Sequence, residues 1–343
     1  MIQKTKSKHK PLFQIKQLSK KYKLKYSLYY KLAKFFLISL LLSILIFFMP
    51  FFNIITEQEI EKEISKIEPN YNSLNWNNVK KDFELLVDKY KYLLKNEKNI
   101  DEKSPIWIMW FQGIEKAPQI VKSCVQSIIN NRDKHPVYII NKFNLENYVK
   151  LPSFILEKFN NRTFSITHFS DIVRFALLFK YGGYWIDSTY FITSPLKKVN
   201  TNYFTLKLDY CFTNSHPFIK CLWSGNFMAV SKNSFIATYG YMAFLFYWKK
   251  YNSLIDYFLI DYIIHIAYNK VTVFKDIIGR LPYIRCNIFS LEKCLNSDYK
   301  TLDLKCYFNK LSKKTIPHLY NSNNLTNYGY IIENYKLNMK FIK

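Results

Sequence analysis

The stretch Thr167 to Thr189, THFSDIVRFALLFKYGGYWIDST, constrains the fold more than any other part of this 343-residue chain. Its first half repeats apolar residues at the helical spacing i, i+3, i+4, i+7, and Gly182 follows a basic residue as a helix C-cap does. A short apolar run, 184–186, then ends at Asp187. The pattern predicts a helix that turns on Gly182-Gly183 into a strand, which is a building unit of an α/β sheet.

Two acids and one arginine of this stretch are candidate site residues. Asp171 and Arg174 are three positions apart, so they share one helix face. Asp187 lies where the predicted strand stops, and ligands of open α/β sheets bind beyond the carboxyl ends of strands. We interpret Asp187 as a ligand of a hard divalent cation that bridges a diphosphate, and Asp171 and Arg174 as contacts of sugar hydroxyls. Taken by themselves, these residues have a simpler interpretation: Asp171 and Arg174 form a helix-surface ion pair, and Asp187 only starts a turn.

Together these residues form the pattern S-D-x-x-R-x-x-x-L-x-x-x-G-G-x-W-x-D, which resembles the sugar-binding-region signature of D-x-D glycosyltransferases. More closely, the chain is similar to the capsular polysaccharide synthesis proteins, relatives of glycosyltransferase family 32. The similarity covers roughly residues 104–270. It is carried by PIWIMWFQG (105–113), LPSFILEKF (151–159), HFSDIVRFALLFKYGGYWIDSTYFIT (168–193), WSGNFMAV (223–230) and LIDYFLIDYII (254–264).

The resemblance implies an α/β protein with the GT-A fold of nucleotide-diphospho-sugar transferases. It implies a glycosyltransferase of the hexosyltransferase type, which moves a sugar from a nucleotide-sugar donor to a glycan or lipid-linked acceptor with retention, in capsular or surface polysaccharide synthesis. By the same resemblance, Trp107, Trp110 and Gln112 lie near the nucleotide base, and we assign Gly182 and Gly183 to the donor side. Two tryptophans three positions apart also suit a hydrophobic core.

The resemblance also implies a divalent metal, Mn²⁺ or Mg²⁺, with Asp187 as the first carboxylate of D-x-D. The chain departs from that motif, because Thr189 stands where the second carboxylate is expected, giving D-S-T. A hydroxyl is a weaker ligand than a carboxylate, so we expect Asp187 and Thr189 to need a further ligand. His318 is a candidate late ligand; its alternative interpretation is a loop histidine.

Two more acids lie in a strongly apolar run. Asp256 and Asp261 are five positions apart in LIDYFLIDYII. A carboxylate in apolar surroundings is costly unless it is paired, so we place these two on the acceptor side of the site. The alternative is a helix cap for Asp256 and an ion pair for Asp261.

The N-terminal part predicts a membrane anchor. Residues 1–34 hold 11 Lys and no acid, and Phe35 to Phe52 is an 18-residue run without a charge. About 20 apolar residues span a bilayer. Because lysines precede the run and glutamates follow it, the N-terminus is expected in the cytoplasm. A bacterial inner-membrane protein with a cytoplasm-facing catalytic domain is favoured, with the anchor dipping into one leaflet; the alternative is a Golgi-lumenal domain behind a spanning helix.

These observations divide the chain into a basic segment 1–34, an anchor helix 35–55, a helical stem 56–103 and a catalytic domain 104–343. The formal charge of +25 suits a lipid surface and phosphorylated ligands. No recognised nucleic-acid-binding motif is present, so no nucleic acid partner is expected. The six cysteines are interpreted mostly as buried thiols. A second hypothesis for the whole chain is a non-catalytic, membrane-anchored glycan-binding or assembly protein.

Overall fold

The computed structural model describes residues 27, 29–40, 55–209, 221–314 and 317–343. The chain divides into two compact units, residues 1–54 and residues 55–343. In the first unit, residues 29–40 are helical and exposed.

The predicted anchor, 35–55, falls mostly on residues 41–54, which lie outside the described residues. Within the described part of the chain, no helix is both long enough and apolar enough to cross a bilayer. On this finding the predicted membrane localisation is wrong, in its cytoplasm-facing and its Golgi-lumenal form alike.

The second unit is built on a five-stranded mixed sheet with the strand order β2-β1-β3-β7-β5. The strands β2, β1 and β3 run parallel, whereas β7 is antiparallel to both β3 and β5. This confirms the predicted α/β class. The described residues form the following strands, inside and outside this sheet: β1 (Ile106–Met109), β2 (Val137–Ile140), β3 (Gly183–Ile186), β4 (Tyr190–Ile192), β5 (Tyr203–Thr205), β6 (Lys207–Leu208), β7 (Phe227–Val230), β8 (Tyr283–Ile284), β9 (Phe308–Lys310), β10 (Tyr320–Asn321) and β11 (Asn324–Leu325).

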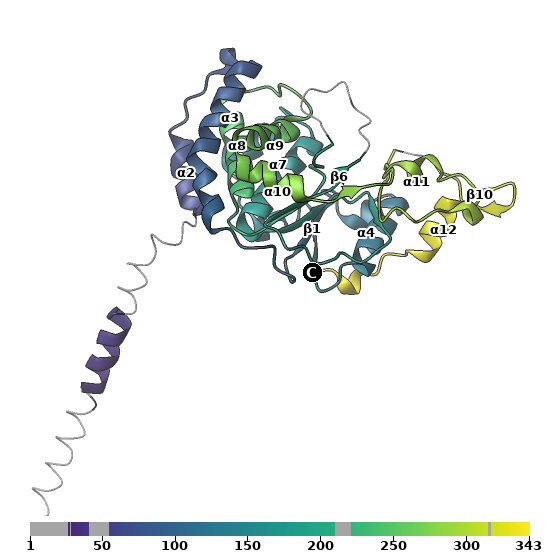
Figure 1. The fold of residues 1–343 in the computed structure, drawn as a ribbon, viewed down its shortest axis with the longest axis horizontal. Helices are drawn as coiled ribbons and strands as arrows, with labels where there is room; N and C mark the ends of the chain where they lie inside the picture. Colours follow the sequence, from purple (N-terminus) through teal and green to yellow (C-terminus); the bar gives the residue numbers. More distant parts are fainter. Residues whose placement is uncertain (1–26, 28, 41–54, 210–220, 315–316) are drawn as a thin grey trace, which may run out of the picture. The chain divides into compact units, whose positions relative to one another are not determined.

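Helices cover both faces of this sheet (Figure 1). Those of the described residues 55–343 are α2 (Glu57–Ser65), α3 (Trp76–Tyr90), α4 (Gln119–Asn130), α5 (Leu145–Tyr148), α6 (Ser153–Asn160), α7 (Ile166–Tyr181), α8 (Phe235–Lys250), α9 (Leu259–Lys270), α10 (Thr272–Arg280), α11 (Ser290–Lys293) and α12 (Asn327–Asn334).

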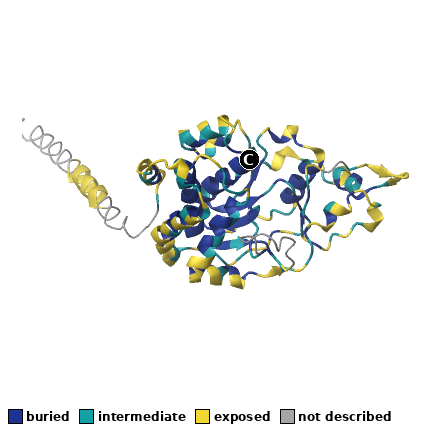
Figure 2. Ribbon diagram, turned by 90° about the horizontal axis from the view of Figure 1, so that it is seen from above, coloured by how far each residue is buried: buried dark blue, intermediate teal, exposed yellow. Residues whose placement is uncertain are grey.

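Strand alternation decides which side chain enters which core. Trp107 and Trp185 point to the face covered by α7, α8 and α9, whereas Ile106, Tyr184 and Ile186 point to the face covered by α4. Figure 2 shows the buried residues concentrated along the sheet and the helices beside it.

The segment predicted as a helical stem is helical, and its helices belong to the larger core. Buried residues of α2 and α3 share one hydrophobic cluster with α8 and α9. Lys250 donates to Asp82 of α3 at 2.8 Å, and the hydroxyl of Tyr251 donates to the same carboxylate at 2.7 Å. The segment is therefore part of the second unit, which contains the sheet. The predicted domain limits at residues 34, 55 and 103 stay predictions.

Candidate active site

The helix α7 and the strand β3 bring the three predicted acid and arginine side chains together. Arg174 Nη1 lies 2.9 Å from Asp171 Oδ1. Arg174 Nη2 donates to Asp187 Oδ1 at 3.3 Å. Arg174 is buried, and the side chain of Asp171 is only 10% exposed. One guanidinium therefore joins a carboxylate of the helix to a carboxylate that follows the strand.

Chain geometry explains why Asp187 returns to Asp171. The helix α7 ends at Tyr181 and is capped by Gly182, whose φ is 67°, and β3 begins at Gly183, whose φ is 96°. The helix rises about 16 Å between Asp171 and Gly182, and the extended chain covers about 16 Å between Gly182 and Asp187. A reversal at the glycines thus brings the two acids to the same level.

Both glycines serve this turn and lie about 13–16 Å along the strand from Asp187. A Cβ atom on Gly183 would lie 2.2 Å from the carbonyl oxygen of Pro105, and one on Gly182 would lie 2.6 Å from the backbone nitrogen of Lys232. Only glycine fits either position. In the structure these two residues shape the backbone turn. They had been predicted on the donor side, but they lie at the other end of β3 from the acids.

Trp185 belongs to the cluster, although it was not among the predicted site residues. Its indole Nε1 donates to Asp187 Oδ1 at 2.9 Å. The Arg174 guanidinium carbon lies 4.8 Å from the centroid of the Trp185 ring, which is a favourable cation–π distance. The indole thus orients both partners of the ion pair. Its signal in the sequence is the W-x-D spacing that ends the signature.

Lys310 is the second site residue that sequence reasoning missed. Its ammonium donates to Asp187 Oδ2 at 3.1 Å and also to the hydroxyl of Thr189. It arrives on β9, which pairs with β4 so that Lys310 lies opposite Tyr190. No local sequence pattern indicates this contact, because Lys310 lies 123 positions from Asp187 in the sequence.

The two carboxyl groups of the cluster differ in their electrostatics. Burial raises the pKa of Asp171 to about 7, against the opposing effect of Arg174 and with support from the charges of Asp187 and Asp261. Burial also acts on Asp187, but Lys310, Arg174 and the hydrogen bond from Trp185 outweigh it, so the pKa of Asp187 is lowered. Asp187 is therefore ionised at neutral pH.

His168 lies behind this pair. Its Nε2 accepts a hydrogen bond from Trp248 Nε1 at 2.8 Å, and burial lowers its pKa to about 3. A neutral ring that accepts at Nε2 carries its proton on Nδ1. That nitrogen lies 3.9 Å from Asp171 Oδ2, so the histidine turns a polar edge toward the buried carboxyl.

A cavity of about 700 Å³ opens beyond the carboxyl ends of β1 and β3, beside the cluster. Four of the predicted site residues, Asp187, Thr189, Trp110 and Gln112, line this cavity, and Tyr257 lines it as well. The other lining residues include Met109, Phe111, Ile166, Thr167, Ser170, Trp185, Ser188, Phe289, Glu292, Lys310, Leu311, Ser312, Lys313 and Lys314.

The two predicted nucleotide-site tryptophans have different surroundings. Trp110 follows the end of β1 and lines the cavity, with Lys313 Nζ 5.4 Å from its ring centroid. Trp107 lies inside β1, is 2% exposed, and donates its indole N–H to the carbonyl of Gly182 at 3.0 Å. Trp107 is thus a core residue in the structure, and Trp110 is the one that a ligand in the cavity can meet.

Asp256, Asp261 and His318, the remaining predicted site residues, also have different surroundings. Asp261, in the first turn of α9, accepts from Trp223 Nε1 at 3.1 Å, and its charge acts on Asp171. Asp256 accepts the backbone N–H of Phe258 at 2.7 Å, in the turn before α9. His318 is exposed at the start of the β10–β11 hairpin and is not among the described residues that line the cavity.

The donor set around Asp187 does not fit the predicted divalent metal. Asp187 and Thr189, the two expected ligands, are both hydrogen-bonded to the Lys310 ammonium. Among the described residues there is no group of three or more His, Cys, Asp or Glu side chains that could hold a metal ion. A cation is thus already placed where the ion was expected.

The cysteines differ from the buried thiols that the sequence suggested. Cys286 and Cys306 form a disulfide, and Cys221 is disulfide-bonded as well. Cys124 is a buried thiol and Cys294 an exposed one, whereas Cys211 lies outside the described residues. Burial of a lone cysteine could be expected from composition, but pairing depends on how distant segments meet.

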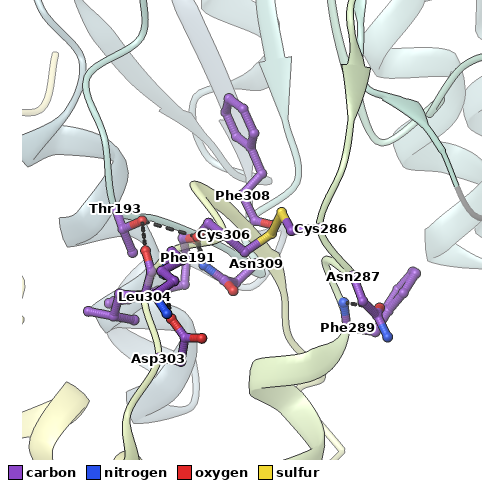
Figure 3. The surroundings of a disulfide bond; sticks show 11 residues. Phe191, Thr193, Cys286, Asn287, Phe289, Asp303, Leu304, Cys306, Phe308 and Asn309 are labelled. Carbon is purple, nitrogen blue, oxygen red and sulfur yellow. Dashed lines mark hydrogen bonds between the residues drawn. A yellow bond between two sulfur atoms is a disulfide. The ribbon is translucent and has the colours of Figure 1, made fainter.

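The Cys286–Cys306 disulfide anchors the strand that carries Lys310. Figure 3 shows it beside Phe308 and Asn309 of β9. The Asn309 amide donates to the carbonyl of Cys306 at 2.8 Å and to that of Phe191 on β4 at 3.3 Å. The strand is therefore held at its start by a covalent bond and along its length by β4.

One comparison with known proteins, that with family models, agrees with the sequence signature. The family model described as capsular polysaccharide synthesis protein matches residues 53–331. No curated protein matches. Among solved structures, the chain is similar to one titled PaToxG Glycosyltransferase, with 13% sequence identity, 60% of this chain and 87% of that chain covered, and a TM-score of 0.29, a likeness too distant to carry an argument. The family match spans most of the chain, and the chain belongs to the capsular polysaccharide synthesis protein family.

Proposed function

We propose that this protein is a glycosyltransferase with a GT-A-type donor site, which transfers a hexosyl group from a nucleotide sugar to a hydroxyl of a glycan or lipid-linked acceptor. The observation that carries the proposal is the cluster of Asp171, Arg174 and Asp187 beside a cavity beyond the carboxyl ends of β1 and β3. Membership of the capsular polysaccharide synthesis family supports the same class of activity.

The cavity suits such a donor in size and chemistry. Its volume of about 700 Å³ is in the range of small-molecule sites. Trp110 offers an aromatic face on which a nucleotide base can stack. Lys313 and Lys314, in the segment after β9, also line the cavity and attract a diphosphate.

The cluster then positions the transferred sugar. Asp187 is ionised and accepts hydrogen bonds from hydroxyls of the donor, whereas Arg174, buried between two acids, keeps the geometry rigid. In the reaction the acceptor oxygen forms a bond to the anomeric carbon while the bond from that carbon to the diphosphate oxygen breaks. The acceptor proton leaves to the diphosphate or to solvent. Retention follows if attack occurs on the face from which the diphosphate departs, and positioning and electrostatics supply the rate.

Asp187→Asn tests the proposal. The substitution keeps the size of the side chain and removes its charge, so turnover of the donor should fall by at least about 100-fold. The measurement is release of nucleoside diphosphate by the full-length protein from a panel of UDP- and GDP-linked hexoses, with circular dichroism to follow the fold.

Asp276→Asn is the matched control, because Asp276 is exposed on α10 and does not line the cavity. It should keep wild-type turnover. Near-normal turnover in folded Asp187→Asn would refute the assignment of the site, and a wild-type protein that consumes no donor would favour a non-catalytic glycan-binding protein.

A further inference from the structure

We propose that the Lys310 ammonium takes the place of the divalent cation in this site and binds the diphosphate of the donor directly, so that the protein binds nucleoside diphosphates without metal. This inference rests on the proposed function and deepens it. Its starting point is that the ammonium is bonded to both Asp187 and Thr189, the two side chains expected to hold the ion.

The hydrogen-bonding capacity of Lys310 leaves room for a ligand. An ammonium has three N–H donors. Asp187 Oδ2 and the Thr189 hydroxyl take two of them, and Lys310 lines the cavity. The remaining donor can reach a phosphate oxygen, and such a charge-assisted hydrogen bond is stronger than a neutral one.

The local charge favours an anion over a dication. Arg174 and Lys310 already balance the carboxylates of Asp171 and Asp187. A divalent ion at Asp187 would lie beside both of these cations and would be repelled by them. Lys313 and Lys314 add further positive charge to the cavity lining, and Glu292 is the other acid among the described lining residues.

The position of Lys310 is fixed by the backbone. Its N–H donates to the carbonyl of Ile288 at 2.7 Å, and the N–H of Leu311 donates to the carbonyl of Thr189 at 2.9 Å. The side chain of Lys310 is 17% exposed, and its Nζ lies 5.1 Å from the centroid of the Tyr190 ring. A cation held in this way needs little ordering when a phosphate arrives, which is the property that a bound metal ion otherwise supplies.

The test is the affinity of the full-length protein for UDP and for GDP, measured by isothermal titration calorimetry in EDTA and in MnCl₂. For the nucleotide that binds, the wild-type dissociation constants in the two buffers should agree within about twofold. In EDTA, Lys310→Met should weaken binding by about 10- to 100-fold, the loss expected for a hydrogen bond to a charged group. Lys310→Arg, which keeps the charge, should recover part of that loss.

Lys293→Met is the matched control, because Lys293 is exposed at the end of α11, close in sequence to the lining residue Glu292 but outside the lining itself. It removes one positive charge and should leave the affinity within about twofold of wild type. Thermal unfolding of each variant reports whether it folds.

The outcomes separate the two proposals. Wild-type binding that is more than tenfold tighter in MnCl₂ than in EDTA overturns the role of Lys310 and leaves the proposed glycosyltransferase standing. An unchanged nucleotide affinity in folded Lys310→Met also overturns the role of Lys310 and leaves the proposed glycosyltransferase standing. Failure of the wild-type protein to bind either nucleotide in both buffers overturns the proposed function, and this inference with it.

Discussion

Asp171 is the residue whose chemistry departs most from that of a surface carboxyl. It is enclosed by Arg174 and Asp187 and by the more distant charge of Asp261, with His168 Nδ1 3.9 Å away. A buried acid that faces another acid costs free energy when it ionises, even beside an arginine. The site therefore holds one carboxyl that titrates near neutrality and one, Asp187, that stays charged.

This difference predicts how stability depends on pH. The pKa of Asp171 is raised from 3.8 to about 7 in the folded protein. The folded state therefore binds more protons than the unfolded state between these values, so this group's contribution to stability is full below about pH 4 and is lost as pH rises through 7. Between pH 5 and pH 8 the wild-type free energy of unfolding should fall by on the order of 2–3 kcal/mol more than that of Asp171→Asn.

Urea unfolding of both proteins at the two pH values measures the difference. The comparison removes the contribution of all other titrating groups, which the two proteins share. Asp276→Asn, on the exposed surface of α10, should behave as wild type. Equal pH dependence in wild type and Asp171→Asn would contradict the raised pKa.

At the scale of elements, the turn from α7 to β3 decides whether the site forms. Gly182 and Gly183 have positive φ angles, and the strand starts against the backbone of Pro105. The part of α7 from Asp171 to Gly182 and the extended chain from Gly182 to Asp187 cover similar distances, which is why a tight reversal is sufficient to align Asp187 with Asp171. A looser turn would move the second acid away from the first.

Gly183→Ala should therefore destabilise the protein by about 3 kcal/mol, from an unfavourable backbone conformation and a clash with the Pro105 carbonyl. Gly279→Ala is the matched control: nothing lies within 4 Å of a Cβ atom there, and Gly279 is within the helix α10. That change should raise stability by up to about 1 kcal/mol. Urea midpoints of both variants give the comparison, and a neutral Gly183→Ala would mean that the turn tolerates a side chain.

At the scale of the whole molecule, the segment after β8 completes the site from a distance. It runs through α11 to β9 and pairs there with β4, directly after the Asp187–Thr189 segment. The disulfide closes a loop with a sequence separation of 20 between Cys286 and Cys306. Lys310 thus depends on contacts formed only when the chain has folded as a whole.

Cys286→Ser combined with Cys306→Ser should lower the free energy of unfolding by about 3 kcal/mol, the loop-entropy value for a loop of this length. The measurement is chemical unfolding without reductant. Cys294→Ser, which removes an exposed thiol, should be within about 0.5 kcal/mol of wild type. A double variant as stable as wild type would show that β4 alone holds β9 in place.

Local pattern was enough to predict much of the fold and part of the site. The helix α7, the glycine turn, the strand β3 and the joining of Asp171, Arg174 and Asp187 all follow from residues within one short stretch, because helix rise and strand rise set their separation. The predicted helical stem contains the helix α3, in which Val79, Phe83, Leu86 and Tyr90 repeat at helical spacing and are all buried.

Tertiary structure alone decided the rest. Strand pairing places Trp107 in the core and leaves Trp110 at the cavity, and it brings Lys310 to Asp187 across 123 positions. The disulfide between Cys286 and Cys306 has the same origin. Short-range spacing determines which side chains share a face, but it cannot determine which distant segment packs against that face. That choice is made by burial and hydrogen bonding over the whole chain. This is why the sequence predicted the two acids and the arginine, whereas only the folded structure revealed the lysine that binds Asp187.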